Sequence, residues 1–145
     1  METFQFNTQL DDARIVEAIR RAEERTSGEV RVYVSDGVVD DPVAAAERQF
    51  VRMGMHETRQ RNGVLVFVAP RSQTFAIVGD EAVHARCGQS FWRDVAAAMR
   101  DRFADGAYTD AIVLGITKAA ELLTAHFPCA PDDRNELPNE VRRGA

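Results

Sequence analysis

The chain has 145 residues, of which 28% are charged, and carries a net charge of −5. A chain of this length fits one domain that buries roughly 70% of the surface of the unfolded chain, so it needs no disulfide or metal to form a core. The acidic balance argues against a nucleic-acid partner, because such proteins usually present a basic face to phosphates. A cation suits this chain better.

Cysteine usage and the first residues indicate a compartment. The two cysteines, Cys87 and Cys129, are too few and too far apart for a disulfide framework or a metal knuckle. The segment METFQFNTQLDD lacks the basic and apolar regions of a signal peptide, and no apolar run approaches the roughly 20 residues that a bilayer requires. We therefore expect a cytoplasmic protein with no membrane partner.

A helix and a strand are predicted first. Thr8 can cap a helix that ends near Gly28 and has apolar positions at the spacing of one face. Valines then alternate with polar residues from Val30 to Val34, which indicates a strand at an edge or covered on one face only. The next helix should begin at Asp41-Pro42, an N-cap followed by proline, and should bury Val43.

A β-hairpin is predicted next. The run from Val64 to Ala69 has no polar residue and suits a central strand covered by helices on both faces. Pro70 to Gln73 form a turn, and a second run from Thr74 ends at Gly79-Asp80. Asp80 can cap a short helix that ends at Gly88.

The direction of these strands brings distant residues to one rim. Strand, helix and strand in this order form a βαβ unit, so the strands that begin at Glu29 and near Asn62 should be parallel. The hairpin is antiparallel, so its second strand ends where its first begins. Glu29, Asn62, Asp80 and Glu81 should therefore lie at the same edge of the sheet.

That rim offers only oxygen ligands, which suit calcium or magnesium rather than zinc. We predict a divalent-cation site formed by Asp80 with Asn62, Glu29 and Glu81. The alternative is that Asp80 is a helix cap and Glu29 a solvated strand residue. Two tail carboxylates, Glu136 and Glu140, could fold back as further ligands.

Two amphipathic helices and a tail complete the chain. The helices have stripes that include Trp92 and Met99 in one and Ile112 and Leu123 in the other. Three prolines then prevent a continuous helix. We predict one domain over residues 1–127, a small three-layer α/β/α sandwich on a short mixed sheet, and an extended tail over residues 128–145.

A cysteine phosphatase is a further hypothesis. Cys87 and Arg93 are separated by five residues, as in loops that wrap a phosphate with backbone amides while a thiolate attacks. Here the loop would carry bulky Phe91 and Trp92, which more readily begin a core-facing helix.

Several strings, in the same order, resemble the TPM domain family, also called thylakoid acid phosphatase-like. The resemblance runs from about Asp11 to Val141 and is to the small soluble bacterial branch with an N-E-L-P tail. The strings are Thr26 to Val32, Met53 to Met55, Arg61 to Leu65, Phe75 to Asp80, Phe91-Trp92, and Asn135 to Glu140.

The resemblance implies a Rossmann-like core, a calcium or other divalent ion in some members, and weak acid phosphatase activity. Many members have an aspartate at the position of Asn62 and G-Y-G at the segment of Gly79 and Asp80, so the ligand set here differs. We expect a TPM-type domain that binds a calcium-like cation, with a regulatory or scaffold role and with the possibility of an unknown protein partner. The alternatives are a metal-assisted acid phosphomonoesterase, whose catalytic residues are unknown, and an interaction domain with neither metal nor catalysis.

Overall fold

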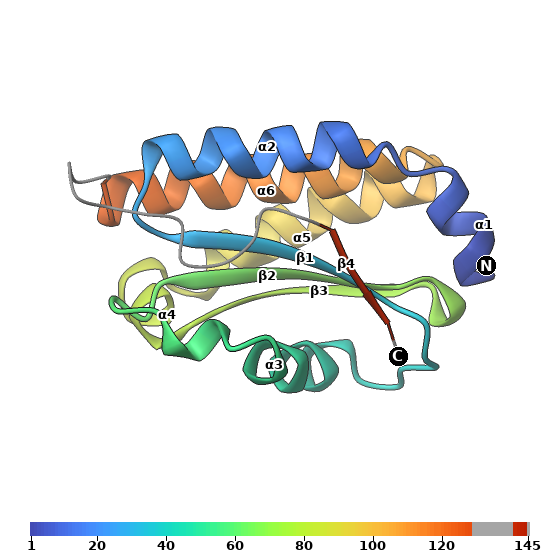
Figure 1. Cartoon of the computed structure of the whole chain (residues 1–145), viewed down its shortest axis with the longest axis horizontal. Helices are drawn as coiled ribbons and strands as arrows, with labels where there is room; N and C mark the ends of the chain where they lie inside the picture. Colours follow the sequence, from blue (N-terminus) through green and yellow to red (C-terminus); the bar gives the residue numbers. More distant parts are fainter. Residues whose placement is uncertain (129–140, 145) are drawn as a thin grey trace.

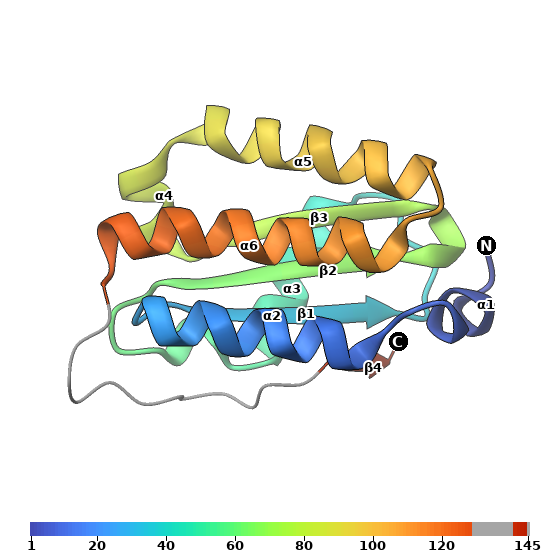
Figure 2. The same cartoon turned by 90° about the horizontal axis from the view of Figure 1, so that it is seen from above.

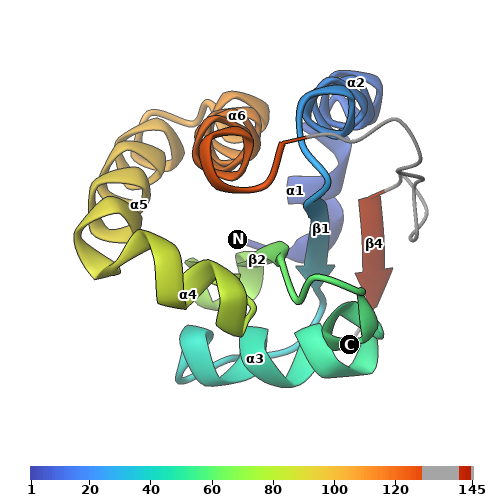
Figure 3. The same ribbon diagram turned by 90° about the vertical axis from the view of Figure 1, so that its left-hand side faces the viewer.

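The chain folds into three layers. The computed structural model describes residues 1–128 and 141–144, so the predicted tail ligands Glu136 and Glu140 lie outside the described residues. Helices α2 (Asp12–Arg25), α5 (Gln89–Ala104) and α6 (Tyr108–His126) lie on one face of a sheet, and α3 (Pro42–Arg52) lies on the other (Figures 1 and 3). The predicted α/β/α sandwich is confirmed.

The sheet has four described strands in the order β3-β2-β1-β4. They are β1 (Glu29–Ser35), β2 (Gly63–Ala69), β3 (Thr74–Gly79) and β4 (Val141–Gly144). β1 is parallel to β2 and to β4, whereas β2 and β3 are antiparallel. The predicted βαβ unit and hairpin are both confirmed, and the 3₁₀ turn Pro70–Ser72 joins the hairpin strands.

The prediction that β1 is an edge or half-covered strand is wrong. All seven of its residues are buried. Apolar cores cover both of its faces, and β4, which the sequence did not predict, pairs along its outer edge from Val32 to Ser35. Arg143 of β4 also forms an ion pair of 2.7 Å between its Nη2 and Oδ1 of Asp12 at the start of α2. Residues 141–144 therefore belong to the sheet.

Two details of the predicted helices are also wrong. Thr8 ends a short helix, α1 (Thr3–Thr8), and the residue that caps α2 is Asp11, whose Oδ1 accepts from the Arg14 amide at 3.2 Å. An aspartate caps a helix as well as a threonine does, and the cap at Asp11 starts α2 three residues later than a cap at Thr8 would. Val43 is 50% exposed, although its spacing from the buried Ala46 and Phe50 places it on the same side of α3; it lies in the first turn of the helix, one turn before the first buried residue.

Each face of the sheet has its own apolar core. Val30, Val32 and Val34 of β1 pack with α2, α5 and α6, while Tyr33 of the same strand stacks on Phe67 of β2 above α3. Side chains alternate between the faces of a strand, so a buried strand needs apolar residues on both. Within the described residues, no helix combines the length and apolarity needed to cross a membrane.

The end of β3 leaves no room for a side chain, which gives a first prediction. A Cβ at Gly79 would lie 2.8 Å from Cγ1 and 3.1 Å from Cβ of the buried Val83, whose short side chain cannot move aside. We expect Gly79→Ala to lower the free energy of unfolding by about 1–3 kcal/mol, as measured by urea denaturation.

Gly115→Ala in α6 is the matched control. Its Cβ would also meet a side chain at 2.8 Å, but the atoms concerned are the flexible end of Met99, and alanine favours the helix by about 1 kcal/mol over glycine. Near-neutral stability is expected there. Equal losses in both variants would contradict the assignment of the cost to the rigid Val83.

Candidate functional site

The predicted rim exists. Glu29 is paired with Gly63 where β1 and β2 begin, and Gly79 at the end of β3 is paired with Val64. The Asp80 amide continues this pairing by donating to the Gly63 carbonyl at 2.9 Å. The rim lies at the end of the sheet beside α4 (Glu81–Cys87), opposite the hairpin turn (Figure 2).

Asp80 is held by Arg61 through two hydrogen bonds. Arg61 Nε donates to Oδ2 at 2.9 Å and Nη2 donates to Oδ1 at 3.0 Å. The Asp80 side chain is 5% exposed and that of Arg61 is 42% exposed. The carboxylate is therefore buried, and the arginine lies at the surface of the rim. These hydrogen bonds raise the pKa of the Arg61 guanidinium above its ordinary value, and the arginine remains charged at any physiological pH.

Asp80 is also a helix cap, as predicted. Its Oδ1 accepts from the Glu81 amide at 2.7 Å at the start of α4. Glu81 itself is 73% exposed, and its Oε2 lies 3.6 Å from Arg61 Nη2. One guanidinium therefore lies between the carboxylates of two successive residues.

Glu29 belongs to a second, buried ion cluster. Its Oε2 accepts from Arg31 Nη2 at 2.8 Å, and Arg31 Nη1 lies 2.8 Å from Oε1 of Glu23 on α2. The Arg31 side chain is 1% exposed, and its Nη1 also donates to the Val30 carbonyl at 2.6 Å. The alternative reading of Glu29 as a solvated residue is therefore wrong, because the arginine two residues along the strand draws it into the interior.

Asn62 takes part in neither cluster through its amide nitrogen. Nδ2 donates to Ser27 Oγ at 3.2 Å, and the residue is 1% exposed. Its backbone carbonyl approaches Gly28 so closely that a Cβ there would lie 3.1 Å away. Asn62 therefore ties the entrance of β1 to that of β2.

Comparisons with known proteins agree with this fold. The family model of the TPM domain matches residues 6–122. The chain belongs to the TPM domain family. Its structure is similar to the NMR structure of the BA42 protein from the psychrophilic bacterium Bizionia argentinensis, with 36% identity and a TM-score of 0.85 over 94% of this chain and 96% of that one. A search of curated proteins finds no match.

The rim of this TPM domain does not fit a cation as its side chains stand. Three of the lone pairs of Asp80 already accept hydrogen bonds from Arg61 and Glu81, and a carboxylate has about four. Glu29 points to Arg31 instead of to Asp80. Within residues 1–128 and 141–144, no group of three or more histidine, cysteine, aspartate and glutamate side chains gathers as a metal site requires.

The cysteine-phosphatase hypothesis also fails in this TPM domain. A phosphate loop needs consecutive backbone amides that turn around the anion. The residues that follow Gly88 instead begin α5 at Gln89, so Arg93 belongs to a helix. Phe91 and Trp92 pack edge to face there, with ring centroids 5.3 Å apart.

Neither of the two arginines that pair with the carboxylates of the rim was predicted from the sequence. Arg31 had a signal, since residues i and i+2 of a strand share a face and Glu29 and Arg31 have opposite charges. Arg61 had a weaker one. Its pairing with Asp80 spans 19 residues and depends on a left-handed backbone at Arg61, with φ of 51°, which is uncommon for a residue other than glycine.

Removal of Arg31 is the second prediction. Arg31→Leu leaves the carboxylates of Glu23 and Glu29 in the interior without that cation, and breaking a buried pair in this way costs about 3–5 kcal/mol. We expect a loss of this size in urea denaturation. Arg21→Leu, at an arginine that is 74% exposed and pairs with Glu17, should change stability by less than about 1 kcal/mol; similar losses in the two variants would contradict the buried cluster.

Proposed function

We propose that this TPM domain is a non-catalytic binding or scaffold module in which Arg61 takes the place of a divalent cation at the rim. The observation that supports this is the bidentate pair of hydrogen bonds that Arg61 donates to the Asp80 carboxylate. A guanidinium and a divalent cation meet the same need, because each neutralises a carboxylate that the fold holds away from water.

The position of the guanidinium supports the substitution. It contacts both oxygens of Asp80 and lies beside Glu81, so it occupies the space where a cation would bridge these residues. Carboxylate oxygens are the preferred ligands of calcium. A cation could take this place only if the arginine left it.

The same contacts weigh against acid–base catalysis by Asp80. A general base needs a free lone pair within reach of the proton that it takes. Asp80 uses three of its about four lone pairs for Arg61 and for the cap of α4, and Glu29 is buried against Arg31. The rim therefore serves to close the sheet and position α4.

A second candidate is favoured by the exposure of the pair. Arg61 is 42% exposed and Glu81 is 73% exposed, so a cation at high concentration can compete with the guanidinium for Asp80 and Glu81. In that case the unmodified chain binds calcium at the rim, and a metal-assisted phosphomonoesterase becomes possible through water activated by the cation.

The third prediction separates these candidates by thermal unfolding of the chelator-treated protein with and without millimolar calcium. Arg61→Gln removes the charged hydrogen bonds of a buried carboxylate and should destabilise the protein by about 1–2 kcal/mol. Calcium should restore part of this loss, because a ligand that binds only the folded state stabilises it. The unmodified chain should not respond to calcium.

The control is the double variant Arg61→Gln with Asp80→Asn, in which calcium should restore nothing. Calcium stabilisation of the unmodified chain that Asp80→Asn abolishes would support the second candidate and contradict the proposal. Turnover of p-nitrophenyl phosphate that chelator abolishes, and that Asp80→Asn also lacks, would contradict it too. Failure of calcium to restore Arg61→Gln would show that the guanidinium does not stand in for a cation.

A further inference from the structure

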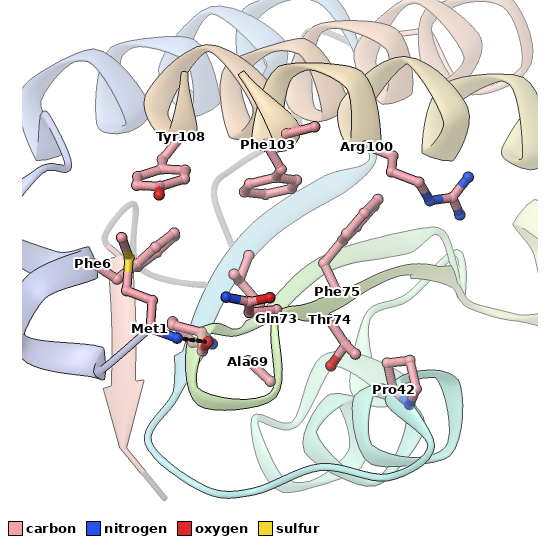
Figure 4. Close-up of a pocket in the computed structure, with 13 residues that line it drawn as sticks. Met1, Phe6, Pro42, Ala69, Gln73, Thr74, Phe75, Arg100, Phe103 and Tyr108 are labelled. Atoms are coloured by element: carbon pink, nitrogen blue, oxygen red, sulfur yellow. Dashed lines mark hydrogen bonds between the residues drawn. The ribbon is translucent and has the colours of Figure 1, made fainter. Parts of the chain in front are cut away.

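A cavity of about 590 Å³ opens at the other end of the sheet, around the hairpin turn (Figure 4). Its volume lies in the range of small-molecule sites, about 300–1,000 Å³. Six parts of the chain line it: Met1, α1, the start of α3, the hairpin, α5 and the start of α6.

One wall of the cavity is a row of aromatic rings. Phe75 of β3 contacts Phe103 of α5 at a centroid distance of 4.9 Å, Phe103 contacts Tyr108 at 6.4 Å, and Tyr108 contacts Phe6 of α1 at 5.1 Å. Phe103 and Tyr108 project from their helices towards the hairpin (Figure 4). Rings held in this way offer a broad apolar surface to a ligand with a flat or apolar body.

The charge of the lining favours an anion. The chain has 23 aspartates and glutamates, yet none lines the cavity, whose one charged side chain among the described residues is Arg100. Arg100 is exposed at the margin, beyond Phe75 (Figure 4). Within the described part of the chain it takes part in no hydrogen bond or ion pair, so it is available to a carboxylate.

Two features of the hairpin also indicate a ligand-binding site. Thr74 Oγ1 is buried and has no hydrogen-bond partner among the described residues, although it lines the cavity. Such a group needs a reason, and an oxygen or nitrogen of a ligand would supply its partner. Gln73 beside it adopts a left-handed backbone with φ of 50°, and strain of this kind gathers at binding sites.

We propose that this cavity binds a small organic acid, with an aromatic or other apolar body against Phe75 and Phe103 and its carboxylate at Arg100. Arginine is suited to this role because its planar fork can donate two hydrogen bonds to one carboxylate. The proposal concerns a different end of the molecule from the rim and does not rest on the exchange of Arg61 for a cation.

The fourth prediction concerns this site and uses 2-naphthylacetate and its neutral analogue 2-naphthylacetamide, titrated into the ¹⁵N-labelled full chain and followed by ¹H–¹⁵N NMR. The acid should give saturable shifts that centre on Gln73 to Phe75 and Phe103 to Tyr108. Arg100→Gln should weaken binding of the acid about tenfold, the effect of losing one charge-assisted pair. The amide should bind more weakly than the acid and should be little affected by that variant.

Two further variants complete the test. Arg93→Gln removes an exposed arginine of the same helix outside the cavity and should leave binding unchanged. Ala104→Trp, at an exposed position of the lining, should block both compounds. Equal affinity for acid and amide, saturable shifts elsewhere in the chain, or no saturable shift up to the solubility limit would overturn the proposal. None of these results bears on the calcium experiments at the rim.

Discussion

The pairing of β2 with a neighbour on each side is the constraint on which the rest of the molecule depends. β2 is buried along its full length, so it must have strands on both edges and helices on both faces. Its parallel partner β1 brings Glu29 to the entrance of β2, and its antiparallel partner β3 brings Asp80 to the same place. The rim and the hairpin end are therefore fixed by one strand.

Charge compensation then decides what the rim can do. The fold brings carboxylates of Glu29 and Asp80 to a region with little water, where an unpaired charge is costly. In this chain Glu29 pairs with the buried Arg31, and Asp80 pairs with Arg61 at the surface. Without Arg61, the Asp80 carboxylate would keep only the hydrogen bond from the Glu81 amide among the described residues, and this is the basis for the proposal that the identity of one side chain separates an ion pair from a cation site.

The sequence predicted the backbone of the site better than its contacts. Apolar runs on either side of the Pro70 turn, and the order strand, helix, strand, were enough to place Asn62 and Asp80 on one rim. Strand β4 had no such pattern, because two of its four residues are arginines and its position comes from pairing with β1. The bond between Arg61 and Asp80 requires both the register of the hairpin and a left-handed residue, and neither follows from composition or periodicity.

The two ends of the hairpin differ because of the same geometry. At the rim, the strand ends and the start of α4 bring acidic residues together, and arginines neutralise their charge. At the turn, the described lining consists of proline, apolar residues, amide and hydroxyl side chains and Arg100, so no acid of the lining neutralises that arginine. A protein with a net charge of −5 repels anions over most of its surface. Acids do lie near this end, among them Asp36 after β1 and Asp41 at the cap of α3, but none lines the cavity, and this is the basis for proposing that it takes an anion with an apolar body.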